Sequence, residues 1–416
     1  MIAYILAYLD RINVGFAALT MNKDLGLTAT QYGFGAGLLF WGYFLFEIPS
    51  NLALERFGAR RWIARIMFTW GLLSIAAAFA TGPTSFVVLR FLLGVAEAGF
   101  FPGVIVYLTY WFTASWRARV IAAFTVAIPA STAIGAPISI SILHLNGLAG
   151  FKGWQWLFIL EGIPSILLGF VVLALLTDRP RDATWLTDEQ TNWIEQSLAS
   201  ERRAVELAHR VSLGQCFIDT RVLALSLILF ANITTNLGLT FFLPQMIRDM
   251  GKTTNQIGLI SAIPYVLGTI GTLALGYLSD KYNERHKTLF ITLMISGVGL
   301  AAAGYLGNTM GAIAMLSFAA IGIHGAKAAL WPIPSMFLTG SAAAAGIALI
   351  NSIGNLGGSA GPWLMGWVKD ATGTYRDGLY LLAAFGFVAG LGSLMISAAK
   401  TRPVTSSSEA RAKAAL

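Results

Sequence analysis

An acidic and a basic residue, Asp10 and Arg11, stand side by side within the apolar stretch AYLDRINVGFA. Ionisable groups inside a membrane span are costly unless they are paired or face water, so they often mark functional sites. The planar guanidinium of Arg11 suits a carboxylate, whereas Asp10 can bind and release a proton. Adjacent side chains on a helix point about 100° apart, so each charge requires its own partner. The pair predicts either anion binding with proton transfer or two ion pairs that lock helices together.

A second acid and base, Arg90 and Glu97, lie seven residues apart in the apolar segment RFLLGVAEAGFFPG. On a helix they share a face and are separated by about 10.5 Å along the axis. Each is therefore better placed to meet a partner on another helix. We expect Arg90 to alternate between Asp10 and Glu97 as protons bind and leave, with a static salt bridge as the alternative.

Three further ionisable residues, Glu47, Glu161 and Lys327, also fall in apolar segments. Glu47 is interpreted as a gating or structural partner of loop arginines, and Glu161 as a partner of basic loop residues or of a neighbouring span. Lys327, with His324 one turn earlier, is expected to offer a second cation to a dianionic substrate. A structural ion pair is the alternative for Lys327.

The composition predicts that these charged residues lie on membrane-spanning helices. Of 416 residues, 56% are hydrophobic and 12% are charged, whereas soluble domains average about 25% charged residues. A span needs about 20 mostly apolar residues, which predicts an all-α membrane protein with twelve transmembrane helices. The expected spans are 2–21, 31–54, 62–81, 85–111, 118–143, 154–177, 217–246, 256–279, 287–306, 310–333, 341–368 and 377–399.

Basic residues are concentrated in alternate loops: one set of loops holds 19 of the 28 Lys and Arg residues, and the other set holds six. The positive-inside rule places the richer set in the cytoplasm. This predicts a multi-pass protein of the inner or plasma membrane with both termini and the linker 178–215 in the cytoplasm. The net charge of +8 follows from this topology and does not indicate nucleic-acid binding. The tail 400–416 is expected to be disordered.

Two matches at an offset of 225 residues indicate an internal duplication. Glu55-Arg56-Phe57 aligns with Asp280-Lys281-Tyr282, and Pro137 aligns with Pro362. Repeated halves around a central site are typical of transporters. The predicted domains are therefore two pseudo-symmetric six-helix bundles, 1–177 and 216–399.

Several stretches resemble a known family in order and at the expected spans. They are YLDRINVGFAALTMNKDLGLTATQYG, GYFLFEIPSNL, RFLLGVAEAGFFPG, YLTYWF, WQWLFILEGIPS and AAAAGIALINSIGNLGG. Together with the acid-basic-aromatic loop after the second span, they are similar to the anion:cation symporter family of the major facilitator superfamily. This resemblance implies the major facilitator fold and the transport of organic anions such as tartrate, sugar acids or aromatic carboxylates. It also implies anion binding by Arg11 and proton coupling by Asp10 and Glu97.

The sequence thus predicts a proton-coupled importer of a small organic carboxylate that works by alternating access and uses the proton gradient, with no cofactor. The candidate residues fall into three groups. Substrate binding is assigned to Arg11, Tyr43, Tyr8, Lys327, Asn355 and Asn236; proton coupling to Asp10, Glu97 and Arg90; and gating to Glu47, Glu55, Arg56, Arg60, Arg61, Asp280, Lys281 and Arg285. No metal-ligand spacing and no nucleophile–base pair is evident, so an enzyme is not expected, and the protein is expected to be a monomer. A proton-independent facilitator or exchanger is the first alternative, and a membrane sensor is a weaker one.

Overall fold

A computed structural model describes residues 1–113, 116–117, 120, 124, 127–207, 219–282, 284–338 and 340–398. Regular structure within these ranges is helical throughout, which confirms the all-α prediction. The expected disorder of residues 400–416 and the last part of the linker, 208–215, concern residues outside these ranges.

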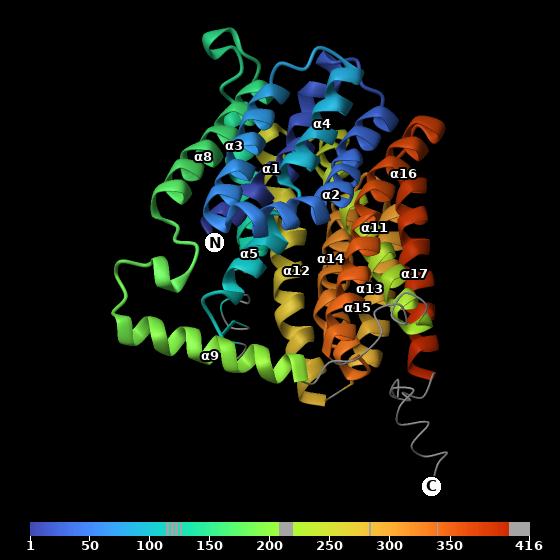
Figure 1. The fold of residues 1–416 in the computed structure, drawn as a ribbon. Helices are drawn as coiled ribbons and strands as arrows, with labels where there is room; N and C mark the ends of the chain where they lie inside the picture. Colours follow the sequence, from blue (N-terminus) through green and yellow to red (C-terminus); the bar gives the residue numbers. More distant parts are fainter. Residues whose placement is uncertain are drawn as a thin grey trace. The chain divides into compact units, whose positions relative to one another are not determined.

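The helices follow one another along the chain in the order shown in Figure 1. They are α1 (Ile2–Asp24), α2 (Ala29–Phe57), α3 (Ala59–Ala77), α4 (Pro83–Glu97), α5 (Phe100–Thr109), α7 (Ala127–Leu143), α8 (Gly153–Leu175), α9 (Asp188–Leu207), α11 (Thr220–Asp249), α12 (Thr254–Tyr282), α13 (Arg285–Leu306), α14 (Met310–Leu330), α15 (Gly340–Asn355), α16 (Gly357–Thr372) and α17 (Arg376–Ala398), with short 3-10 turns at Leu148–Gly150, Pro180–Asp182 and Pro334–Met336.

Every predicted span coincides with one or two of these helices, and α9 lies within the predicted linker. Among the described residues, eight helical segments are long and apolar enough to cross a membrane. Two predicted spans are broken: 85–111 is divided into α4 and α5, and 341–368 into α15 and α16. The first break has a clear backbone cause, since Ala98 is extended (ψ 131°) and Gly99 is left-handed (φ 82°), a conformation that glycine adopts without steric cost.

Local signals in the sequence explain where the first helices begin. Thr28 caps α2 through a reciprocal capping box with Gln31, which satisfies two backbone N–H groups that lack partners within the helix. Gly58, with φ 85°, separates α2 from α3. Pro83 opens α4, at a position where its missing N–H costs nothing.

The described chain forms two compact units. The first comprises Met1–Arg203, Gly238–Val266 and Ser359–Gly378. Within it α1 packs against α7 and α8, α3 against α8 and α4, and α2 against α4. The contact between α2 and α4 depends on Gly94, because a Cβ there would overlap the backbone of Leu39. This close packing brings polar groups of α1, α2, α3 and α4 together.

The second unit comprises Ala204–Leu237, Leu267–Gly358 and Leu379–Leu416. Its apolar core includes Val222 and Leu225 of α11, Leu293 of α13 and Leu330 of α14, all of which are at most 1% exposed. Large apolar side chains remain exposed elsewhere, for example Leu273 on α12 at 72%. Exposed leucines on long apolar helices are expected where helices face lipid.

Candidate functional site

Arg11 forms the central ion pair of the first unit. Its Nε lies 2.8 Å from Oε2 of Glu97, and the exposed fractions of the two side chains are 20% and 1%. The guanidinium carbon lies 5.5 Å from the ring centre of Tyr8 and 5.1 Å from that of Tyr43. The structure thus brings together four predicted site residues from α1, α2 and α4. The Arg11–Glu97 pairing itself was not predicted.

The position of Glu97 follows from the helix break described above. Glu97 is the last residue of α4, immediately before the extended Ala98. Its second oxygen, Oε1, is buried without a hydrogen-bond partner among the described residues. Arg11 therefore provides the hydrogen bond that stabilises the charge on this carboxylate, and any group that replaces Glu97 at Arg11 leaves a buried acid to be neutralised.

Asp10 points to a different set of neighbours and is fully buried, with 0% exposure. Ser74 Oγ and Trp70 Nε1, both on α3, donate to it over 2.5 and 3.2 Å, and Asn13 Nδ2 lies 3.5 Å away. Trp70 and Ser74 are one turn apart, so both reach the same carboxyl. The sequence reasoning missed these donors, although two polar groups spaced i, i+4 in an apolar helix were a usable signal.

Arg90 lies on α4 and is 1% exposed. None of its three guanidinium nitrogens makes a hydrogen bond with the described part of the chain. It interacts electrostatically with both Asp10 and Glu97. Neither expected direct contact is formed in this structure, so the alternation of Arg90 between the two acids stays a prediction.

Glu161 contacts neighbouring helices. A neighbouring span was one of the two kinds of partner predicted for it. Its Oε2 accepts a hydrogen bond of 2.6 Å from Asn13 Nδ2 on α1, and its Oε1 accepts one of 3.4 Å from Ser139 Oγ on α7. Asn13 therefore contacts both Glu161 and Asp10.

The substrate candidates from the second half of the sequence belong to the second unit. Lys327 on α14 has no acidic partner among the residues described, and it interacts electrostatically with His324 one turn earlier. Asn236 on α11 and Asn355 at the end of α15 are partly exposed. A further polar residue, Asn232, is held by its Nδ2 hydrogen bond of 3.0 Å to the carbonyl of Ile323.

The predicted gating residues lie near the ends of helices, except for Glu47 in the interior of α2. In the first unit, the backbone N–H of Arg60 donates to Asp178 over 2.7 Å and its Nε donates to the carbonyl of Leu173 over 2.5 Å. Arg56 lies over the ring of Phe57, Glu55 and Arg61 are exposed, and the backbone carbonyl of Glu47 accepts from Asn51. In the second unit, Lys281 lies near the rings of Tyr277 and Tyr282, Arg285 begins α13, and the side chain of Asp280 is outside the described set. Their gating role stays a prediction.

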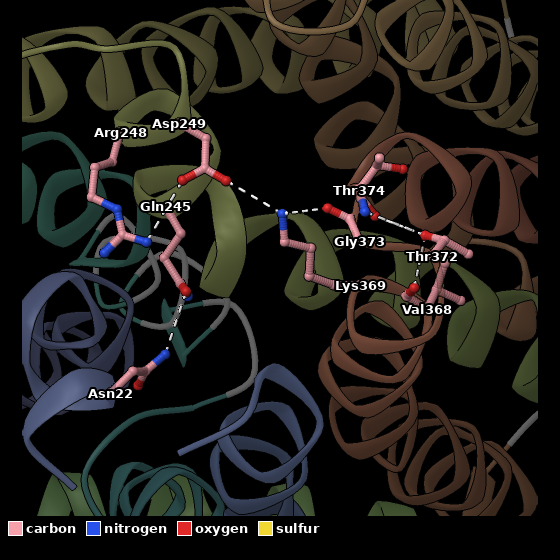
Figure 2. A network of polar contacts seen from close by, with 9 residues as sticks. All are labelled: Asn22, Gln245, Arg248, Asp249, Val368, Lys369, Thr372, Gly373 and Thr374. Carbon is pink, nitrogen blue, oxygen red and sulfur yellow. Dashed lines mark hydrogen bonds and ion pairs between the residues drawn. The ribbon is translucent and has the colours of Figure 1, made fainter. Parts of the chain in front are cut away.

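A polar network at the opposite helix ends was not predicted (Figure 2). Asn22 of α1 donates to Gln245 of α11 over 3.4 Å, and Asp249 lies 3.6 Å from Arg248 and 3.4 Å from Lys369 of α16. Arg248 also donates to the carbonyl of Leu19 over 2.8 Å. All of these residues lie in the first unit.

Asp370 extends the same connection to the start of α2. Its two carboxylate oxygens accept hydrogen bonds from the backbone N–H groups of Ala29 and Thr30, over 3.1 and 2.7 Å. An acidic group is stabilised at a helix N-terminus by the unpaired N–H groups and the helix dipole. A little deeper, the Tyr32 hydroxyl donates to the carbonyl of Phe241 over 3.0 Å. The ends of α1 and α2 are thereby connected to those of α11 and α16. We call these contacts, from Leu19 to Asp370, the outer latch, because the topology predicted from the sequence would place them on the side opposite the cytoplasm.

Long apolar helices that bury ionisable groups define the class of a multi-pass membrane transporter, and the comparisons with known proteins agree. The profile of the Major Facilitator Superfamily matches residues 1–362 and 223–416. A protein of Agrobacterium vitis named "Putative tartrate transporter" is 47% identical over 97% of this chain and 90% of its own length. The "Quinolone resistance transporter" of Acinetobacter baumannii is 41% identical over 92% of this chain and 88% of its own.

The same fold is found in a solved structure, a bacterial homologue of the human lysosomal transporter Spinster. It has a TM-score of 0.80 and 16% sequence identity and covers 97% of both chains. The chain belongs to the Major Facilitator Superfamily, and it is a secondary transporter with the major facilitator fold, not an enzyme. The predicted family resemblance is confirmed.

Proposed function

We propose that the protein is a symporter that imports a small organic carboxylate together with protons across the cell membrane. One observation carries this proposal. Arg11, between the rings of Tyr8 and Tyr43, is partly exposed and paired with the buried Glu97, and it directly follows the fully buried Asp10. A permanent cation is thus combined with two acids that can take up protons. The relative from Agrobacterium vitis that is named "Putative tartrate transporter" supports a carboxylate as the substrate.

The geometry of Arg11 suggests how proton binding and anion binding are coupled. The ion pair with Glu97 uses Nε, and the two terminal guanidinium nitrogens are outside it. A carboxylate of the substrate competes with Glu97 for Arg11. Protonation of Glu97 removes the buried negative charge that this competition would otherwise leave unpaired. Substrate binding at Arg11 is therefore favoured when Glu97 carries a proton, and restoring the ion pair releases both ligands.

The remaining predicted site residues complete the proposal. Lys327 would offer a second positive charge to a dianion, and Asn236 and Asn355 would donate hydrogen bonds to substrate oxygens. Asp10 would exchange a proton while Arg90 turns between Asp10 and Glu97. The outer latch would separate when the transporter opens to the outside and re-form when it opens to the cytoplasm. Both termini would lie in the cytoplasm, and the protein would act as a monomer.

Transport by purified protein in liposomes tests this proposal, with radiolabelled tartrate as the probe. An inward proton gradient is expected to drive accumulation of tartrate above its external concentration. A protonophore should abolish this accumulation while leaving exchange of external for internal tartrate intact. Uptake that is unaffected by the proton gradient would instead establish a facilitator or exchanger. Absence of both uptake and exchange would contradict tartrate as a substrate.

A further inference from the structure

Glu161 is a buried acid to which the coupling scheme assigns no role. It lies in the interior of α8 with 6% exposure. Its two hydrogen-bond partners, Asn13 and Ser139, are neutral. A buried carboxylate without a compensating cation is costly, and a buried carboxylic acid is much less so.

Within the part of the chain that the structure describes, the helices packed against α8 offer no cation to this carboxyl. These helices are α1, α3 and α7. Gly162, next to Glu161, packs against Gly71 of α3, and the basic residues of α3, at positions 60, 61 and 65, precede Gly71 by at least six residues, or about 9 Å along the helix. On α1, Arg11 is paired with Glu97, and Lys23 and Asp24 lie in its last turn. The sequence of α7 contains no charged residue. Asp10 is the ionisable group found to interact electrostatically with Glu161.

Asn13 joins the two acids through a single amide. Its Nδ2 donates to Glu161 over 2.6 Å and lies 3.5 Å from Asp10. Its Oδ1 is buried without a donor among the described residues. Two carboxylates that share a buried site and lack a cation between them repel each other, so one of them takes up a proton.

A proton on Glu161 satisfies this arrangement better than a proton on Asp10. A protonated Glu161 becomes a hydroxyl donor, and it can donate to Asn13 Oδ1, the buried acceptor that lacks a partner. Asn13 Nδ2 then remains available to Asp10. Asp10 has further donors in Ser74 and Trp70 and the electrostatic attraction of Arg90, so the negative charge is better stabilised on Asp10.

We infer that Glu161 is a proton-binding site, connected to Asp10 through Asn13, that holds its proton at neutral pH in this state of the transporter. The site adds a third acid to Asp10 and Glu97. Its part in symport rests on the proposed function, whereas proton binding itself requires no substrate.

Infrared spectroscopy of the purified protein without substrate tests the site directly. At neutral pH we expect a carbonyl stretching band from a protonated carboxylic acid. Glu161→Gln should remove this band. Glu189→Gln, which removes an exposed carboxyl from α9, is the matched control and should retain it. Persistence of the band at full intensity in Glu161→Gln would overturn the inference.

A second measurement needs no substitution and so does not depend on the folding of a variant. Labelling the glutamates of the wild-type chain with carbon-13 at the carboxyl group should shift the band to lower wavenumber. The same labelling of the aspartates should leave it in place. A band that responds to aspartate labelling alone would assign the proton to an aspartate and refute the site at Glu161.

Asn13→Ala tests the bridge between the two acids. Without the amide, Glu161 loses its stronger hydrogen-bond partner, so its carbonyl band should move to higher wavenumber. An unchanged band position would contradict the role of Asn13. Because none of these experiments uses tartrate, a failure of tartrate transport would refute the proposed function and leave the proton site standing.

Discussion

Replacing Arg11 by lysine tests the anion-binding role with the smallest change of charge. In the structure Nε of Arg11 contacts Glu97 at 2.8 Å. The guanidinium is rigid and planar, so a substrate carboxylate that displaces Glu97 can bind it through two nitrogens at once. A lysine places all of its donors on one flexible ammonium. That ammonium can replace the positive charge beside Glu97, but it cannot hold a substrate carboxylate through two parallel hydrogen bonds.

The expected loss can be estimated from the hydrogen bonds involved. A hydrogen bond to a charged group contributes about 1.5–3 kcal/mol. Losing one of these from the substrate complex raises Kd roughly 10- to 150-fold. The fold should suffer less, because the positive charge beside the 1% exposed Glu97 is retained. Arg11→Ala would instead leave that carboxylate unpaired, at a cost of about 3–5 kcal/mol.

Calorimetric titration of tartrate into the detergent-purified protein measures this change. The melting temperature without ligand reports whether the variant is folded. The matched control is Arg181→Lys, which makes the same substitution at an exposed position in the linker and should bind like the wild type. Wild-type tartrate affinity in folded Arg11→Lys would refute the role of Arg11 as the anion site.

Three further predictions concern coupling, the outer latch and the second unit. Glu97→Gln should abolish accumulation driven by a proton gradient while retaining tartrate exchange, since the neutral amide mimics the protonated acid; loss of both at normal expression would indicate a structural role. Asp370→Asn should weaken the outer latch by about 0.3–1 kcal/mol, the usual contribution of an acidic group at a helix N-terminus. Spin labels at positions 34 and 255 should report a shorter distance when the latch is closed and a longer one when it is open. The population of the longer distance should rise roughly two- to fivefold in this variant. Burial works to raise the pKa of Asp370, two residues beyond the predicted span 341–368, but hydrogen bonds from Thr30 and Ala29 outweigh it and hold this pKa below its ordinary value. The stabilisation is therefore fully present at neutral pH, begins to decline once the pH falls below the ordinary aspartate pKa and is lost as the pH falls through the lowered pKa. Opening that is already complete in mild acid, above the ordinary aspartate pKa, would contradict this. Asp219→Ala removes the side chain that accepts from the backbone N–H of Arg221 at the start of α11 and should lower stability by about 0.5–2 kcal/mol in thermal unfolding, whereas Asp219→Asn, which can still cap the helix, should lose less.

Much of the fold was predictable because it depends on local sequence. Apolar segments of sufficient length predicted the positions of the helices, and the polar stretch from Asp178 predicted the linker. The break after Glu97 was not predicted, since the apolar segment continues without interruption through Ala98 and Gly99. A glycine in an apolar segment is compatible with close helix packing as well as with a break, and local sequence alone does not distinguish the two.

The partners of the buried charges could not be predicted from a single sequence. Arg11 and Glu97 are 86 residues apart, and their contact depends on how α1 and α4 are rotated about their axes. The same holds for Ser74 and Trp70 at Asp10. The outer latch depends on backbone N–H groups of Ala29 and Thr30, which are common to all residues except proline and leave no trace in side-chain patterns.

The adjacency of Asp10 and Arg11 shows how one helix would serve both ligands in the proposed symport. Arg11 contacts α4 and the ring of Tyr43 on α2, whereas Asp10 contacts α3. A movement of α1 that changes the contact of Arg11 with Glu97 therefore also changes the hydrogen bonds of Asp10, because the two side chains share one backbone. The backbone positions of the two residues cannot separate without unwinding the helix. Separating them by one inserted residue in α1 should thus rotate Arg11 away from Glu97 and uncouple anion binding from proton binding, even if each ligand still binds.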